Sequence, residues 1–474
     1  MALLLLKDIN SFRNMYNKDK KALLMKKAKN KRHHWLLLAF LLPLAALAQT
    51  GDTASGKRYE LSLQQAIDHA NQNNLDIKNG LIDVLLQKET NRQTTAAALP
   101  KVTVNGSFTD NLQLQKTLLP GELVGQPGTL IPVQFGTKYI TSGTAELTQI
   151  LFDGQVFVGL QARRTSIDWA NKKVEVTQQT IKANVYKVYY QLVASKTQVD
   201  LLDSNIVLIK KQQHDAEVMY KNGFAEKLDV DRASVALANL ETERAKLLTT
   251  INNGYYGLKL LLGIPTADQL VLTDTLSNEM IRGGILENST YQYADRKDYQ
   301  YLQLTRDFNA YNIRRYKLSK IPTLSLDASY NKQLQENKFK FDGNWFTASY
   351  VALRLSIPIF NGFATNSKIA AAKLTVQQLD NQIQNMKISI DNEVVTSRNT
   401  LRTSIAAMDY QQKNMELAEE VYRQTKKKYE VGTGSSTDLT TAQKDLQQAQ
   451  TNYINALYDA IIAKVDFLNA TGKL

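Results

Sequence analysis

A duplicated series of short motifs constrains the fold of this chain more than any other sequence feature. Four pairs of motifs occur in the same order in the two halves: ALPKVTVNGSFT at 98–109 with KIPTLSLDASYN at 320–331, FDG at 152–154 with FNG at 360–362, YKNGFAEKLDV at 220–230 with YEVGTGSSTDL at 429–439, and LLG at 261–263 with ATG at 470–472. A shared order at similar spacing indicates that one structural plan is used twice.

The spacing within the two halves separates constant segments from variable ones. Gly154 and Gly223 are 69 residues apart, and their counterparts Gly362 and Gly432 are 70 apart. In contrast, the first half has 14 more residues than the second between its proline and its FDG motif, around the Pro/Gly-rich stretch 118–132. This pattern predicts architectural elements of fixed length beside a surface loop that is free to vary.

Before its FDG or FNG motif, each half has apolar residues at every second position. Val351, Leu353, Leu355, Ile357 and Ile359 alternate with smaller or polar residues, and the stretch from Val102 to Thr109 alternates in the same way. Strict alternation predicts strands with one apolar and one polar face. We therefore predict two strands in each half.

After each of these motifs, the spacing of the apolar residues becomes that of a helix. Val185, Leu192, Val199 and Ile206 are seven residues apart, and the same step runs through the second half from Val394 to Tyr429. A sustained seven-residue period is typical of a coiled-coil seam. Because neither 155–222 nor 364–430 contains proline, each stretch predicts one helix of about 100 Å. Shorter helices are expected at these stretches: 63–97, 227–262, 292–319 and 436–470.

The N-terminal residues are predicted to be an export signal. Ten Lys or Arg residues precede the apolar run WLLLAFLLPLAALA at 35–48, which is too short for a membrane span but suits a signal peptide. The predicted domains are a signal peptide at 1–48 with Met25 as an alternative start, a first repeat at 49–263, a linker at 264–291 and a second repeat at 292–474.

Composition excludes several classes of function. The net charge of +13 falls to +5 without residues 1–48, so the basic excess is no sign of nucleic-acid binding. The chain has no cysteine, which rules out disulfides, thiolate metal sites and a cysteine nucleophile. GTGSS at 432–436 lacks the lysine of a phosphate-binding loop. No set of nucleophile, base and metal ligands is apparent, so we predict no enzyme activity and no cofactor.

The duplicated motifs, the two strands per half and the long helices together resemble the TolC-like outer-membrane efflux protein family. The resemblance covers about residues 60–474, beginning with LSLQQAIDHANQNNLDIK at 61–78. It implies an α+β membrane protein. Three chains would form a 12-stranded outer-membrane β-barrel, four strands from each, continued by a coiled-coil helical tunnel in the periplasm.

The function that the resemblance implies is passive conduction through the outer membrane of a Gram-negative-type envelope. The channel would be the exit duct of a tripartite efflux or type I secretion system. Its implied partners are two further copies, a periplasmic adaptor, an inner-membrane pump and outer-membrane lipid. The sequence leaves open a non-conducting exported scaffold or adhesin stalk, although four symmetrically placed strands argue against it.

Candidate functional residues lie in two regions. On the strand at 351–357, Val351, Leu353, Leu355 and Ile357 are predicted to face lipid. The turns around 222–228 and 431–437 are predicted to form the periplasmic tip, where the adaptor would dock, with these candidate residues: Gly223, Asp229, Gly432 and Gly434.

Asp438 matches a family position that helps to form an acidic constriction at the periplasmic opening. Thr441 stands where the family's type member has a second aspartate, and Gly434 stands where it has a basic residue. We predict that Asp438 and Thr441 line the constriction. The alternative for both Asp229 and Asp438 is stabilisation of a helix N-terminus.

Overall fold

Two long helices dominate the fold, as their proline-free sequences predict. The computed structural model describes residues 56–277, 281 and 290–474, except residue 126; the predicted signal peptide and the Met25 start lie outside the described residues. The first long helix, α4, spans Gly154–Lys221 and has 68 residues, and the second, α7, spans Ala364–Glu430 and has 67. At 1.5 Å per residue each is about 100 Å long.

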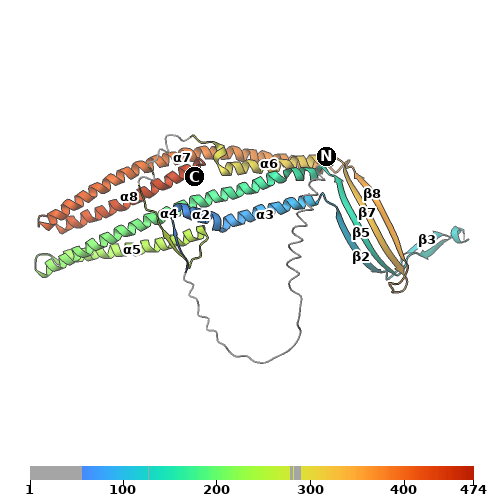
Figure 1. The fold of residues 1–474 in the computed structure, drawn as a ribbon, viewed down its shortest axis with the longest axis horizontal. Helices are drawn as coiled ribbons and strands as arrows, with labels where there is room; N and C mark the ends of the chain where they lie inside the picture. The colour runs from blue at the N-terminus through green and yellow to red at the C-terminus, as the bar shows by residue number, and fades with distance from the viewer. Residues whose placement is uncertain (1–55, 126, 278–280, 282–289) are drawn as a thin grey trace, which may run out of the picture. The chain divides into compact units, whose positions relative to one another are not determined.

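Each long helix turns back into a shorter one, so that the two halves form two helical hairpins (Figure 1). Helix α5, Lys227–Leu262, packs along α4, and helix α8, Ser436–Ala470, packs along α7. Most of the predicted seam residues are buried within them, including Val185, Leu192 and Val394, while Tyr422 and Tyr429 near the tip are partly buried. The apolar seams therefore hold each hairpin together.

The other ends of the two long helices are covered by shorter helices. Helix α3, Leu75–Ala96, packs on α4, while α6, Lys297–Leu318, packs on both α4 and α7. A single 3₁₀ turn, η3, Tyr293–Asp295, precedes α6. In both halves of the duplication a helix packs on a long helix before the strands, α3 or α6, and two helices follow the strands.

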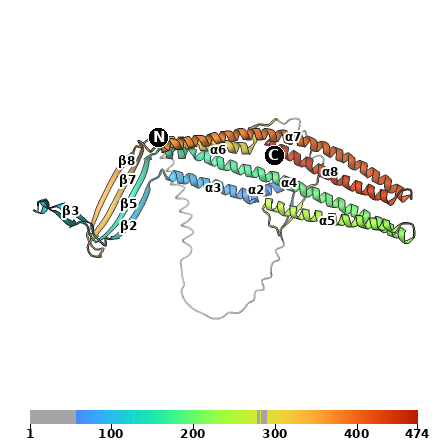
Figure 2. The same ribbon diagram turned by 180° about the vertical axis from the view of Figure 1, so that it is seen from behind.

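A four-stranded antiparallel sheet is built from both halves (Figure 2). The strand order is β2-β5-β7-β8. The strands span Lys101–Asp110 (β2), Tyr139–Phe152 (β5), Thr323–Glu336 (β7) and Trp345–Ser356 (β8). The two strands per half are confirmed, and the duplication explains why the halves join at the centre of the sheet, β5 against β7.

The FDG and FNG motifs mark the change from strand to helix in both halves. In the first half β5 ends at Phe152 and α4 begins at Gly154, with the Asp153 carboxylate accepting a hydrogen bond from the Gln155 N–H at 2.7 Å. In the second half seven residues separate β8 from α7. In the first half, then, the aspartate of the motif is the cap of the long helix that follows it.

The loop region between β2 and β5 contains structure that the sequence pattern did not predict. It holds a short hairpin of β3, Lys116–Pro120, and β4, Leu130–Gln134, with the 3₁₀ turn η1, Gly121–Val124, between them. These two strands form a separate sheet.

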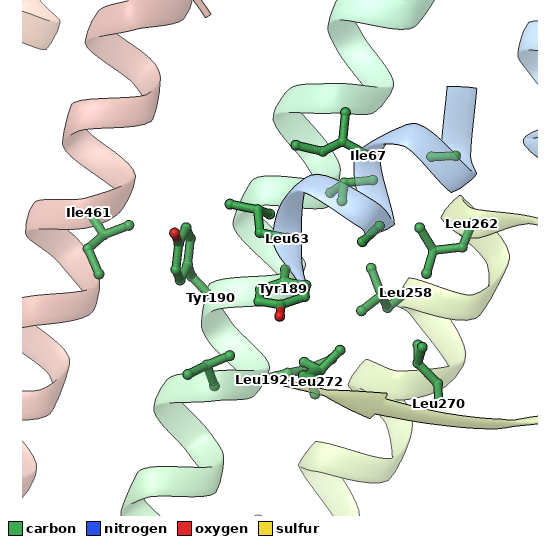
Figure 3. Close-up of a cluster of buried hydrophobic side chains, with 14 of the residues drawn as sticks. Leu63, Ile67, Tyr189, Tyr190, Leu192, Leu258, Leu262, Leu270, Leu272 and Ile461 are labelled. Atoms are coloured by element: carbon green, nitrogen blue, oxygen red, sulfur yellow. The ribbon is translucent and has the colours of Figure 1, made fainter. Parts of the chain in front are cut away.

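Two further four-residue strands were also missed. Strand β1, Arg58–Leu61, pairs in parallel with β6, Gln269–Leu272, which lies within the predicted linker. They cover the largest buried cluster, in which Tyr189 of α4 lies among Leu63, Leu258 and Leu272 (Figure 3). Residues 278–280 and 282–289 of the linker lie outside the described residues.

The predicted helix at 63–97 is in fact two helices, α2, Leu63–Asn73, and α3. They are divided by Asn74, whose side-chain oxygen accepts hydrogen bonds from the N–H groups of Asp76 and Ile77. Its side-chain amide donates to the Leu261 carbonyl at 2.8 Å. Asn74 thus caps α3, which is a local signal that the prediction of one continuous helix overlooked, and it also binds the break to α5.

Candidate channel-forming surfaces

The four-stranded sheet has one apolar face. The β8 side chains of Val351, Leu353 and Leu355 stand opposite Ala328, Leu326 and Leu324 of β7. All three β8 residues are exposed in the single chain, and Leu353 retains 68% of its accessible surface. Ile357, the fourth residue predicted for this surface, is also exposed but follows the end of β8. An apolar sheet face without cover needs a non-aqueous environment or a partner.

The opposite face is polar and internally hydrogen bonded. An ion pair joins Arg354 of β8 to Asp327 of β7 at 3.2 Å. Farther along, the Asn331 amide donates to the Thr144 hydroxyl at 2.6 Å. The alternation predicted from the sequence therefore separates an apolar from a polar surface.

Both edges of the sheet are unpaired within the described chain, since β2 and β8 each have one neighbouring strand. Unpaired N–H and C=O groups on an edge strand favour pairing with another strand, and in lipid they are not tolerated at all. Four strands with two open edges cannot close a barrel within one chain.

Each strand connects to a helix at the same end of the sheet. In chain order these connections are α3 to β2, β5 to α4, α6 to β7 and β8 to α7. The two other connections, β2 to β5 and β7 to β8, lie at the opposite end. A closed ring of such strands would therefore continue into a ring of helices on one side only.

The turns at the far ends of the two hairpins have the same geometry. Gly223 and Gly432 both have positive φ, 82° and 78°. In each turn the residue after the glycine donates its N–H to a carbonyl five residues back, Phe224 to Met219 and Thr433 to Lys428. This arrangement is a Schellman motif, which satisfies carbonyls at a helix end and requires the left-handed conformation that glycine adopts readily.

Gly434 is needed for a different reason. A Cβ at this position would lie 2.9 Å from the Tyr429 nitrogen and 3.1 Å from the Lys428 carbonyl carbon. Ser435 follows it and caps α8, its hydroxyl accepting the Asp438 N–H at 3.1 Å. Serine, not Asp438, is therefore the capping residue.

The two candidate aspartates lie in the first turns of their helices, with different surroundings. Asp229 is partly buried on α5 and lies 3.8 Å from Arg232. Asp438 is exposed on α8, and Thr441, one turn farther on, is exposed as well. A carboxylate in the first turn is favoured by the helix dipole in both cases.

Sequence reasoning missed the contacts that join the two hairpins near these turns. Arg232 of α5 donates through Nη1 to the Thr437 hydroxyl of α8 at 2.8 Å. Tyr429 of α7 has its pKa raised by burial and, to a smaller extent, by the charges of Asp229 and Asp215. These side chains are far apart in the sequence, so no local pattern identifies them.

Between α5 and α8 lies an open groove of about 490 Å³. Its lining combines apolar, charged and hydroxyl side chains and includes Thr441: Leu228, Asp231, Arg232, Val235, Ala236, Asn239, Thr437, Thr440 and Thr441. Asp438 does not line it. The structure thus places Thr441 on the side of α8 that faces α5.

From Gln198 toward the tips, the two hairpins also meet through polar side chains. Gln198 of α4 donates to Asn455 of α8 at 2.7 Å. Seven and fourteen residues later, Asn205 donates to Gln450 at 3.5 Å and Gln212 to Thr440 at 3.2 Å. The interface between hairpins therefore consists of hydrogen bonds toward the tips and of an apolar part in the middle, where Tyr190 of α4 shares a buried cluster with Leu457 and Ile461 of α8.

Among the described residues, no group of His, Cys, Asp or Glu side chains is arranged to hold a metal ion. No helix of the described chain is both long enough and apolar enough to span a membrane.

The family model described as outer membrane efflux protein matches residues 66–264 and 294–473, which together make up most of the chain. The chain belongs to the outer membrane efflux protein family. The two matched segments also correspond to the two halves of the duplication.

Relatives of this efflux protein support the assignment. It is 20% identical over 339 residues to the outer membrane protein TolC of Vibrio cholerae, covering 71% of this chain and 77% of TolC. It is 23% identical over 457 residues to the outer membrane efflux protein BepC of Brucella suis, covering 92% and 90%. Its fold is similar to that of the Campylobacter jejuni CmeC outer membrane channel, with a TM-score of 0.68 at 17% identity over 87% of this chain and 85% of CmeC.

Membership of this family establishes the general function. The efflux protein is a TolC-type channel of the Gram-negative outer membrane, used for efflux or secretion, and it is a transport protein rather than an enzyme. The family implies a trimeric channel that works with efflux partners. The scaffold or adhesin stalk considered from the sequence is therefore not supported.

Proposed function

We propose that three copies of this chain form the exit duct by pairing β8 of each copy with β2 of the next. The observation that carries the proposal is the two-faced, four-stranded sheet with an open edge on each side. Pairing around a threefold axis satisfies every edge and closes twelve strands, which is the condition for a β-structure to persist in lipid.

In this assembly the apolar face contacts outer-membrane lipid and the polar face lines the lumen. Val351, Leu353 and Leu355 belong to the lipid-facing band, and Ile357 continues it past the end of β8. Arg354 and Asp327 face water inside the barrel, where their ion pair needs no apolar cover.

At the opposite end we propose that the tip binds a periplasmic adaptor, which links the channel to an inner-membrane pump. The turns of Gly223 and Gly432 present backbone carbonyls and side chains at the hairpin ends, while Gly434 and Asp229 shape the adjoining first turns. The groove between α5 and α8 offers a mixed apolar and polar surface suited to a helical partner. Transport is driven by the pump, so the channel itself needs no cofactor. Nucleic acid is not among its proposed partners.

The narrowest point of the proposed duct lies near Asp438. Three copies of this exposed carboxylate around the axis would form an acidic ring, with Thr441 one helical turn along. Rings of acidic side chains favour cations in a pore. The constriction therefore favours the passage of cations over anions.

The proposed assembly is tested with purified protein in planar bilayers. We expect discrete conductance steps from a species that migrates as a trimer on gels before heating and as a monomer after heating. A stable monomer without conductance would contradict the duct.

Adaptor docking is tested with a photo-crosslinking residue introduced in cells at Val235, an exposed residue of the groove that has no part in the constriction. Capture of a periplasmic adaptor from Val235, but not from the exposed Lys88 of α3, would support docking at the tip. Equal capture from both positions would contradict it.

A further inference from the structure

The segment between β2 and β5 is unusually apolar for a connection at the end of the sheet away from the helices. Residues 111–138 contain three charged residues, Lys116, Glu122 and Lys138. They contain ten large apolar residues: Leu112, Leu114, Leu118, Leu119, Leu123, Val124, Leu130, Ile131, Val133 and Phe135. Leu123 retains 72% of its accessible surface and Leu130 retains 65%. Such a surface is characteristic of a contact site.

The hairpin formed by β3 and β4 is apolar on both faces. On one face Leu118 pairs with Pro132 and Pro120 with Leu130, while on the other Leu119 pairs with Ile131. Within the described chain neither strand is hydrogen bonded to a third one. A two-stranded hairpin alone is marginally stable in water. This hairpin therefore needs a partner that covers it.

The position of the hairpin in the chain indicates which partner is available. It directly follows β2, which is an edge strand of the four-stranded sheet. In the trimeric channel that edge is the boundary with the next copy. Each hairpin thus leaves the sheet beside a junction between protomers, and three hairpins meet at one end of the barrel.

The hairpin is also long enough for the three copies to touch. Twelve strands spaced about 4.8 Å apart and tilted by about 40° enclose a barrel of roughly 24 Å diameter, so the wall is about 12 Å from the axis. Five residues of strand span about 17 Å. Each hairpin therefore reaches from the wall to the axis.

We propose that the β3–β4 hairpins of the three copies pack against one another through their apolar faces at the barrel mouth. The proposal rests on the trimeric duct proposed above. Insertion into lipid does not explain the hairpin, because both of its outer strand edges carry unpaired backbone groups that lipid does not tolerate. The other copies are always present at a high effective concentration, which a separate partner is not. The contact both locks the trimer and narrows its outer opening.

The absence of cysteine from the chain makes the test direct. In the Leu130→Cys variant the introduced thiol is the only one, so a disulfide on mild oxidation reports contact between copies. We expect a covalent dimer on denaturing, non-reducing gels, about tenfold more abundant than for Asp342→Cys in the β7–β8 connection at the same end of the sheet.

Apolar packing is separated from mere proximity by a second variant. Adding Leu118→Asn and Leu123→Asn to Leu130→Cys is expected to abolish the covalent dimer while the heat-sensitive trimer band remains. A covalent dimer of unchanged yield in this variant would overturn apolar packing between the hairpins.

Two other outcomes would also overturn the proposal. If Leu130→Cys trimers form no disulfide and react with a water-soluble maleimide as fast as Asp342→Cys, the hairpin is free. If they form no disulfide but resist the reagent, another molecule or lipid covers it. Absence of the trimer band in the parent protein would instead contradict the duct.

Discussion

Asp229 and Asp438 occupy matching places in the two tip turns, yet their surroundings differ. Asp229 is partly buried beside Arg232, whereas Asp438 is exposed and, within the described residues, makes no ion pair. Arg232 in turn donates to Thr437 of the other hairpin. The first aspartate therefore belongs to a contact between hairpins, and the second is available to the lumen.

We expect Asp438→Asn to weaken the cation selectivity of the channel and Asp229→Asn to do much less. Asparagine keeps the size of the side chain but removes the three charges of the proposed ring. Ser435 provides the cap of α8, so Asp438→Asn leaves the helix N-terminus intact. Reversal potentials in a salt gradient measure the difference. A shift caused by Asp229→Asn alone would mean that the inner and outer hairpins are exchanged.

Tyr189 lies in the buried cluster that the β1–β6 sheet covers, and its replacement probes the stability of that cluster. Its hydroxyl donates to the Leu61 carbonyl at 3.0 Å, and burial raises its pKa to about 12. An unfolded tyrosine ionises near pH 10. Between these two values the folded protein holds a proton that the unfolded chain has lost, so stability falls as the pH rises.

We therefore expect Tyr189→Phe to make the thermal midpoint less dependent on pH between about 10 and 12. At neutral pH the variant is expected to be less stable by about 1 kcal/mol, because the Leu61 carbonyl loses its hydrogen bond. Circular dichroism of the helices follows both effects. The matched control is Tyr410→Phe, since Tyr410 is 71% exposed; an equal change of slope in the control would contradict the role given to Tyr189.

At the scale of elements, the part of each hairpin toward the tip is apolar inside and polar toward the other hairpin, whereas in the middle both hairpins share one apolar cluster. Leu202, Ile206, Ile209 and Leu240 form a buried cluster between α4 and α5. Toward the tips the contact of α4 with α8 is instead made by the Gln198–Asn455 pair and its successors. Hydrogen bonds that exchange with water contribute little net stability, whereas buried leucines contribute more.

We expect Leu240→Ala to loosen the first hairpin by about 2 to 4 kcal/mol and Gln198→Ala to cost about 1 kcal/mol or less. Hydrogen exchange in the trimer measures this directly. Faster exchange over 227–250 is expected for Leu240→Ala only. Similar acceleration by both changes would show that the hairpins are not the separate stable units.

The strands give a second test at this scale. Leu353 and Ala352 are neighbours on β8 whose side chains point to opposite faces. A lysine facing lipid near the midplane costs about 2 to 4 kcal/mol. We expect Leu353→Lys to reduce the amount of assembled trimer in outer membranes, and Ala352→Lys to change conductance without this loss. Equal loss from both variants would contradict the assigned faces.

The long helices and the strands of the main sheet could be predicted because each carries its own periodic signal. Helices α4 and α7 end where proline-free seven-residue patterns end, and β8 shows strict alternation. The break at Asn74 was missed although asparagine is a favoured helix cap, whereas its bond to Leu261 in another helix leaves no local signal. Strands β1 and β6 are four residues long, too short to show a period.

The candidate sites were predictable to different extents for the same reason. The tip glycines Gly223 and Gly432 follow from local turn chemistry, and both have positive φ. The lipid-facing residues follow from alternation and remain a proposal. The bond from Arg232 to Thr437 joins residues 205 positions apart, and the apolar hairpin of β3 and β4 lies in a stretch read only as a loop. Long-range contacts leave no local pattern.

For the whole molecule the decisive question is whether the outer edge of β2 is paired. In an antiparallel strand, consecutive residues direct their N–H groups to opposite sides. The N–H groups of Thr103 and Val104 therefore point toward different neighbouring strands. One of them bonds to β5 and the other points to the open edge. Proline lacks the N–H, so it breaks the ladder on whichever side its residue faces.

In an isolated sheet, therefore, one of the two variants Thr103→Pro and Val104→Pro would be tolerated, because the edge-facing N–H bonds only to solvent. In a closed trimer both face a neighbouring strand, one in the same chain and one in the next copy. We expect both variants to lose the heat-sensitive trimer band and the conductance, while Gln113→Pro, beyond the end of β2, keeps them. If one strand variant assembles and conducts normally, β2 is a free edge and the barrel closes elsewhere.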